Sequence, residues 1–390
     1  ADYKGATGTV YAYNGGVEWA PIRSLRLRAN YGRSVRAPNL ADLYTPLGQN
    51  FATVVDPCSA RNIGTGSSTR AANCAADGVP TGGPQPYDYV YTSSLGFLSG
   101  GNPNLGEETS DSYTIGGVFR PEFLPGFFVS ADYYLIKVNQ VITAPSAQGI
   151  INSCYDAADI NNQFCALFER AGPGGGPRGE IQGRILEGSL QVVPLNYAQL
   201  EVSGIDFEAG YERDIGKIGH LSLHAVYTHA LKNNNYLDPT NPGRADRVLG
   251  ELGDPEDLFN INGSIKSGPF TFGYRVRYIG KQTNGAYENY FSVQGRAPQN
   301  EDAFEDQYKF YPTTWYHDLR LNVEVEKKYD FYAGVDNLFN TNPPFGLSGA
   351  GGGSGIYTAW AVTAGSLPDG LSLGATNGQL SGKPTTAGAY

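Results

Sequence analysis

Cysteine and histidine are the side chains whose spacing could first indicate chemistry. The four cysteines form two close pairs, Cys58 with Cys74 and Cys154 with Cys165. Neither pair has the Cys-x-x-Cys spacing of a zinc site, and only four histidines occur, so no metal site is expected. The even count and close spacing favour two local disulfides and an oxidising compartment. The alternative is four unpaired thiols in a cytosolic protein.

No arrangement of residues indicates catalysis. His220 and His224 alternate onto one face of a predicted strand, but further metal ligands cannot be placed beside them. No Gly-x-Ser-x-Gly nucleophile motif occurs, and strand alternation explains the many carboxylates. The glycine-rich segment 349–355 is not followed by Lys-Ser/Thr, as a phosphate loop would be. We therefore expect no catalytic residue, no cofactor and no enzymatic activity.

Aromatic clusters in predicted loops are the candidate ligand-binding residues. Aromatic faces with a few polar groups suit a sugar, a catecholate ring or a macrocycle. The alternative for each residue is packing within its loop. The candidates are Tyr87, Tyr89, Tyr91, Phe97, Tyr287, Tyr290 and Phe291.

The loops that carry these residues connect predicted strands. Period-two alternation of apolar and charged residues predicts that the strands are long and have one apolar face and one charged face. In segment 315–326, Leu319, Leu321 and Val323 point one way, and Arg320 and Glu324 point the other. The same pattern recurs in segments 25–32, 203–212 and 270–278. If the charged face lines a wet interior, the lumen-facing residues include Arg275, Arg277, Asp318, Arg320 and Glu324.

Ten strands are predicted, with short and long links alternating between them. Both cysteine pairs fall in the two longest links, 37–109 and 143–195. A soluble domain seldom contains such long loops, whereas a transmembrane barrel has short periplasmic turns and long outer loops. The predicted strands span residues 8–20, 24–36, 110–121, 126–142, 196–213, 219–235, 257–267, 270–284, 313–327 and 329–340.

Composition agrees with a chain of many strands. Glycine occurs 52 times and tyrosine 27 times among 390 residues, and only 17% are charged. The net charge of −10 argues against nucleic-acid binding. A soluble sandwich would also alternate, but its strands average about 5–6 residues, and several predicted here reach twelve or more. We therefore predict an all-β, antiparallel transmembrane β-barrel whose apolar face contacts lipid.

Four segments carry a family resemblance. They are 25–44 (LRLRANYGRSVRAPNLADLY), 102–142 (NPNLGEETSDSYTIGG and onward), 196–211 (NYAQLEVSGIDFEAGY) and 335–342 (VDNLFNTN). Together they resemble the C-terminal half of the barrel of TonB-dependent outer-membrane receptors. The charges Arg33 and Arg36 in the first segment either brace inward-facing carboxylates or simply face the lumen.

The resemblance implies a fold and a function. The family builds a 22-stranded barrel around an N-terminal plug, so residues 1–345 would be about 10–11 of those strands. It implies a Gram-negative outer-membrane location, contact with membrane lipid, and uptake of a siderophore, cobalamin or glycan driven by the TonB machinery. The plug and the TonB-engaging segment would lie before Ala1, so we expect an excised piece that does not transport by itself.

The C-terminal tail has a different character. Residues 346–356 are expected to be a glycine-rich loop or linker, and residues 357–390 resemble the immunoglobulin-like repeats of bacterial surface proteins. A complete sandwich module is far longer, so we expect a truncated module that packs poorly on the barrel. Two alternative functions follow: a passive porin-like channel, or a cell-surface adhesin or interaction protein.

Overall fold

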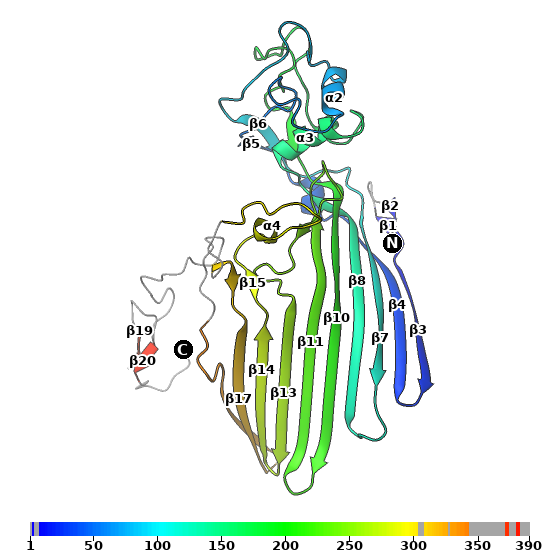
Figure 1. The fold of residues 1–390 in the computed structure, drawn as a ribbon, viewed down its shortest axis with the longest axis vertical. Helices are drawn as coiled ribbons and strands as arrows, with labels where there is room; N and C mark the ends of the chain where they lie inside the picture. The colour runs from blue at the N-terminus through cyan, green and yellow to red at the C-terminus, as the bar shows by residue number, and fades with distance from the viewer. Residues whose placement is uncertain are drawn as a thin grey trace.

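One large antiparallel sheet dominates the fold (Figure 1). The computed structural model describes residues 2–3, 8–302, 308–326, 328–342, 371–373 and 380–382. Neighbouring strands in the sheet follow one another along the chain, in the order β18-β17-β14-β13-β11-β10-β8-β7-β4-β3, and β12 adds to one end of β11. The predicted antiparallel all-β fold is confirmed, and the described part of the sheet does not close on itself.

The main strands are long. They are β3 (Tyr13–Ile22), β4 (Leu25–Arg36), β7 (Glu108–Phe119), β8 (Phe127–Thr143), β10 (Leu195–Ile215), β11 (Gly219–Tyr236), β12 (Asp246–Arg247), β13 (Asp257–Ser267), β14 (Phe270–Ile279), β17 (Thr314–Val325) and β18 (Tyr329–Val335).

Three of the ten predicted strands are five residues shorter at one end than predicted, whereas the ends of the other seven agree to within two residues. The chain before β3 forms the hairpin β1 (Asp2–Tyr3) and β2 (Gly8–Thr9). Beyond β14 the chain leaves the sheet, and β15 (Gln282–Thr283) pairs instead with β16 (Phe310–Tyr311). After β18 the backbone enters the left-handed region at Asn337 and Asn340, which ends the extended run.

The two faces of the sheet differ as the alternation predicts. Ile115 on β7 is 61% exposed and Leu321 on β17 is 41% exposed, while Leu319 and Val323 are half-buried. None of these apolar side chains lies in a dry core, as a soluble sandwich would require. The opposite face carries ion pairs such as Arg28–Asp132 at 2.6 Å and Lys266–Glu324 at 3.2 Å.

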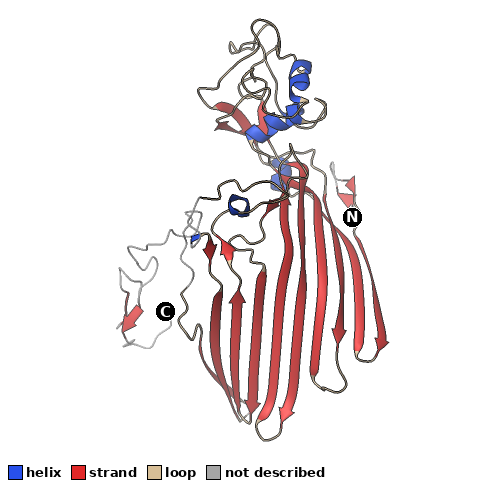
Figure 2. Cartoon of the chain, in the orientation of Figure 1, coloured by secondary structure: helices blue, strands red, loops and turns tan. Residues whose placement is uncertain are grey.

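The hydrophobic core lies beyond one end of the sheet, in the segment that we call the cap (residues 48–99 and 147–192; Figure 2). The two longest links fold together there around Leu95, Ile150, Ile151, Tyr155 and Leu190, which are fully buried. The cap consists of β5 (Gly48–Ala52), α2 (Arg70–Ala76), β6 (Leu95–Ser99), α3 (Ala147–Asp156), the 3-10 turn Cys165–Leu167 and β9 (Leu190–Val192), and α1 (Leu40–Tyr44) precedes it.

A smaller group of loops lies beside the cap end, with β15, β16 and α4 (Tyr287–Tyr290). None of the helices in the described part of the chain is long and apolar enough to cross a membrane. In the tail, β19 (Leu371–Leu373) pairs with β20 (Leu380–Gly382). The boundaries predicted at 346–356 and 357–390 otherwise lie outside the described residues.

Candidate ligand-binding site

Two disulfides close the cap, and both were predicted. Cys58 bonds to Cys74 across 16 residues, and Cys154 bonds to Cys165 across 11 residues. The second disulfide anchors α3, whose N-terminus is capped by the Ser146 hydroxyl accepting from the Gly149 amide. Each link therefore carries one covalent loop closure, which limits the conformations open to the unfolded chain.

A buried ion pair joins the two links inside the cap. Arg170 donates two hydrogen bonds of 2.8 Å to the Asp56 carboxylate, whose side chain is 0% exposed. Tyr87 also donates to Asp56, and Arg170 donates to the Tyr155 hydroxyl. Burial, together with the charge of Asp56, raises the pKa of Tyr87. The guanidinium, the carboxylate and both phenols are therefore structural.

A second pair holds α2 to the end of α3. The Asp156 carboxylate accepts hydrogen bonds from the Arg70 guanidinium and from the Ser67 amide. Burial opposes the ionisation of Asp156, but these bonds outweigh it and hold its pKa below the usual range.

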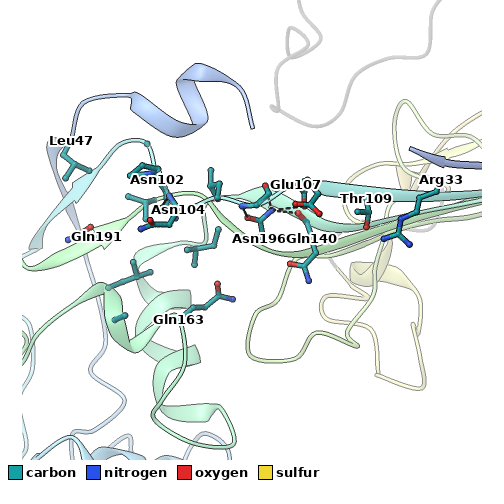
Figure 3. Close-up of a pocket in the computed structure, with 18 residues that line it drawn as sticks. Arg33, Leu47, Asn102, Asn104, Glu107, Thr109, Gln140, Gln163, Gln191 and Asn196 are labelled. Atoms are coloured by element: carbon teal, nitrogen blue, oxygen red, sulfur yellow. Dashed lines mark hydrogen bonds between the residues drawn. The ribbon is translucent and has the colours of Figure 1, made fainter. Parts of the chain in front are cut away.

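A cavity of about 970 Å³ lies where the cap meets the ends of β4, β7, β8 and β10 (Figure 3). Arg33, Thr109 and Gln140 extend into it from the sheet, and Gln163 and Gln191 reach it from the cap. We call this space the amide cavity, because six carboxamide side chains line it: Asn102, Asn104, Gln140, Gln163, Gln191 and Asn196.

Two of the six carboxamide side chains form hydrogen bonds to the backbone, and the other four have hydrogen-bonding groups that a ligand could use. Asn102 donates to the Pro194 carbonyl at 2.9 Å. Asn196 donates to the Gln140 carbonyl at 2.9 Å and accepts from the Gly106 amide at 2.8 Å. The side chains of Asn104, Gln140, Gln163 and Gln191 bond to no other described residue. Each offers a donor and an acceptor to a polar ligand.

A second cavity, of about 470 Å³, is aromatic. Tyr278, Tyr287, Phe291 and Phe310 line it, and the Lys281 ammonium lies 4.8 Å from the ring centre of Phe310. Of the predicted ligand-binding aromatics, Tyr287 and Phe291 thus reach a cavity. We call this space the aromatic cavity.

The other five predicted aromatics lie within loop structure. Tyr87 and Tyr91 are 5% and 9% exposed in the cap core, and Tyr290 is 4% exposed. Their ring faces are covered in this conformation, because they pack as part of the buried interior of their loops. Tyr89 and Phe97 are partly buried against the same core.

The five residues predicted to face the lumen share one face of the sheet. Arg275 and Arg277 lie 2.9 Å and 3.6 Å from the buried Asp318 carboxylate, Arg320 pairs with Asp336, and Glu324 pairs with Lys266. Their water-filled surroundings remain a prediction.

Arg33 and Arg36 do not act together. Register without a shift along β4 and β7 places Arg36 opposite Glu108 and Arg33 opposite Asp111, on opposite faces of the sheet. Arg36 braces Glu108 through two hydrogen bonds of 2.6 Å. Arg33 instead lies on the face that carries Tyr31 and Tyr113, so the interpretation that treated both as inward charges was wrong for one of them.

Titratable clusters elsewhere show no metal chemistry. Within the described ranges, no group of three or more His, Cys, Asp or Glu side chains is arranged to hold a metal ion. His224 pairs with Glu208 and His220 with Asp214 on the charged face. In the smaller loop group, burial and then the charge of Glu288 raise the pKa of Asp246.

The amide cavity was missed by sequence reasoning. Its residues come from four strands and two links, and no spacing connects Gln140 with Gln163 or Gln191. A partial signal existed, because α3 carries apolar residues at Ile150 and Ile151 beside a cysteine. That pattern could have indicated that the long links have a core of their own.

The comparisons with known proteins agree with this geometry. The family model described as TonB dependent receptor-like, beta-barrel matches residues 1–338, and the Ig-like domain model He_PIG matches residues 323–390. No curated protein matches the sequence.

Several solved structures share the fold. A variant of the ferric enterobactin receptor PfeA of Pseudomonas aeruginosa is 15% identical, with a TM-score of 0.51 over 86% of this chain and 35% of that one. Another PfeA variant, in complex with enterobactin, is 16% identical, with a TM-score of 0.51 over 86% and 36%. The siderophore receptor PirA of Acinetobacter baumannii is 12% identical, with a TM-score of 0.50 over 87% and 40%.

The chain spans about a third of the length of these receptors. The match to the family model over residues 1–338 spans all ten consecutive antiparallel strands of the large sheet. The chain therefore belongs to the TonB-dependent receptor-like β-barrel family.

Proposed function

We propose that this chain forms part of a TonB-energised receptor in a Gram-negative outer membrane, and that its cap end captures a small, neutral, oxygen-rich ligand such as a glycan. The observation that carries the ligand class is the amide cavity. Four carboxamide side chains with free hydrogen-bonding groups face a space of about 970 Å³. A plug and the TonB machinery would supply the coupling.

The charge balance of the cavity favours a neutral ligand over a ferric catecholate. Arg33 and Glu107 are the two charged residues among those that line it, so the lining carries one charge of each sign, and Arg33 already lies 3.8 Å from the Asp111 carboxylate. A highly anionic chelate would need several cations that are not already paired. Carboxamides instead match hydroxyl groups, because each both donates and accepts.

The aromatic cavity supports the same ligand class. Tyr287 and Phe291 line it from α4 and the residue after α4, which lies toward the cap end of the sheet (Figure 1), and apolar sugar faces stack on such rings. Phe97 and Tyr89 remain candidates only if the cap rearranges. The PfeA and PirA neighbours are siderophore receptors, so a ferric siderophore is the competing ligand.

Calorimetry with the purified chain tests the ligand class. The probes are neutral oligosaccharides of two to six sugars and ferric enterobactin. We expect saturable binding of an oligosaccharide, weakened about 3- to 10-fold by Gln163→Ala, which removes hydrogen bonds to the ligand. Gln49→Ala is the control, because Gln49 is exposed on β5 and is not one of the residues that line the cavity. Binding of the ferric chelate alone would contradict the proposed ligand class.

Transport separates active uptake from a passive channel. In cells that express the full-length receptor, uptake of the bound saccharide should stop when a protonophore collapses the proton gradient. Uptake that continues unchanged would support the porin-like alternative. The Ig-like match at residues 323–390 favours a second candidate, a surface interaction role, which predicts host-surface binding with no uptake defect on deletion.

A further inference from the structure

An apolar groove of about 500 Å³ crosses the exposed apolar face of β3, β4, β7 and β8. Its wall and floor residues are Val17, Ala29, Tyr31, Tyr113, Ile115 and Tyr133. Val17, Ile115 and Tyr113 are each close to half exposed or more. On a surface that faces lipid, such a groove has the shape and chemistry to hold a hydrocarbon chain.

Small residues create the groove, and aromatic residues bound it. Ala29 and Gly15 leave the floor low, and a Cβ added at Gly15 would meet no atom within 4 Å. Tyr31 and Tyr113 lie side by side, with ring centres 4.9 Å apart, at the end of the groove nearer the cap. The groove therefore ends at a row of phenol rings.

Directly beyond the phenol rings, on the side nearer the cap, basic and acidic side chains alternate from strand to strand on the same face. Strand register places Arg33, Asp111, Lys137 and Glu201 side by side on β4, β7, β8 and β10. We call these four residues the outer belt, and Arg33 is also a lining residue of the amide cavity, so the two sites adjoin at this side chain. Below the outer belt on β8, Phe127, Val129, Ala131, Tyr133 and Leu135 form an apolar run of roughly 27 Å, close to the height of a barrel's apolar band.

The two acids of the outer belt are engaged, whereas its two cations are loosely held. Asp111 accepts from the Tyr31 hydroxyl at 2.7 Å, and Glu201 accepts from Lys232 at 3.3 Å and from Tyr236 at 3.2 Å. Arg33 lies 3.8 Å from Asp111 and Lys137 lies 3.7 Å from Glu201. Neither cation donates a hydrogen bond to another described residue, and their side chains are 37% and 41% exposed.

We propose that the groove and the outer belt together form a binding site for an anionic acyl lipid, with one hydrocarbon chain in the groove and the phosphate-bearing headgroup on Arg33 and Lys137. Tyr31 and Arg33 are two residues apart on one face, roughly 7 Å, so the headgroup lies directly above the chain. Basic residues at the rim of an apolar band attract anionic headgroups in this way. The inference rests on the proposed membrane-spanning role of the sheet.

Lipid retention tests the site. The full chain is reconstituted into nanodiscs of equal parts phosphatidylcholine and phosphatidylglycerol, and native mass spectrometry measures which lipid stays bound after release. We expect phosphatidylglycerol to be enriched, and each of Arg33→Gln and Lys137→Gln to reduce the enrichment about fivefold. Arg26→Gln is the matched control, because Arg26 has a similarly loose pair at 3.6 Å but lies on the charged face.

The groove has its own variant. Gly15→Leu places a side chain in open space without backbone strain and should abolish retention of the bound lipid, whereas Gly48→Leu, equally unobstructed on β5, should not. Equal retention of the two lipids, or full retention in Gly15→Leu, would overturn the site while leaving the membrane-spanning sheet intact. Failure of the chain to enter the bilayer at all would instead overturn the proposed function.

Discussion

Arg170 gives the sharpest stability test, because it is the buried cation that joins the two links of the cap. Its side chain is 3% exposed, and it donates to Asp56, to Tyr155 and to the Gly183 carbonyl. Replacing it with methionine keeps most of the apolar volume and removes the charge. Asp56 would then keep only the Tyr87 hydroxyl and the Cys58 amide as partners.

The expected cost of Arg170→Met is about 3–5 kcal/mol of cap stability, because a buried carboxylate loses its counter-charge. Arg61→Met is the matched control. Arg61 makes a bidentate pair with Asp88, at 2.8 Å and 2.6 Å, in the same cap, but both side chains are well exposed. Water solvates Asp88 when Arg61 is removed, so we expect little or no change.

Hydrogen exchange of cap peptides, read by mass spectrometry, measures both variants in the full chain. We expect protection to collapse across the cap, residues 48–99 and 147–192, in Arg170→Met, and to be retained in Arg61→Met. The double variant Arg170→Met/Asp56→Leu should recover part of the loss, since no unpaired charge is then buried. Equal effects of the two single variants would refute the reasoning from burial.

Four further outcomes follow from the structure. Replacing Cys58 and Cys74 with serine should cost the cap about 3 kcal/mol, as expected for a loop of 16 residues, and unchanged exchange protection would contradict this. Asp156 has a lowered pKa in the folded cap, so the stability that it contributes is present above its unfolded pKa and is lost as pH falls through its folded pKa. Asp246 has a raised pKa, so its loop should instead lose stability as the pH rises from the unfolded pKa of Asp246 to its folded pKa. Hydrogen-exchange protection factors, corrected for the intrinsic exchange rate at each pH, test the direction of both pH effects. Gly126→Ala, where a Cβ would lie 1.9 Å from the Glu212 carbonyl at φ +87°, should lower the melting temperature more than Gly216→Ala, at φ +49° with open space around it, and equal melting temperatures would count against the turn geometry.

Much of the sheet could be predicted from the sequence, because the alternation that defines each strand involves residues close together in the chain. Alternation fixes which residues share a face, so Arg275, Asp318 and Arg320 were placed together correctly. Strand ends were less accurate, since Asn337 and Asn340 adopt left-handed backbone that no alternation pattern reports. The disulfides were also predictable, because each pair is close in sequence.

The cap and its cavities could not be predicted in the same way. Contacts such as Arg170 with Asp56 join residues 114 positions apart, and their pairing depends on how two links fold around each other. The same dependence explains Tyr87 and Tyr91. The prediction that these tyrosines bind a ligand assumed that the loops have no buried interior. In the folded cap, both side chains are part of such an interior.

The central claim is that the apolar face of the sheet contacts lipid and the charged face contacts water. Spin labels placed one at a time at positions 112–115 of β7, in the chain reconstituted in a bilayer, test it directly by collision with oxygen and with a water-soluble nickel chelate. We expect labels at Tyr113 and Ile115 to collide mainly with oxygen, and labels at Ser112 and Thr114 to collide mainly with the nickel chelate. Equal access of the nickel chelate to both sets, or the reverse pattern, would contradict it.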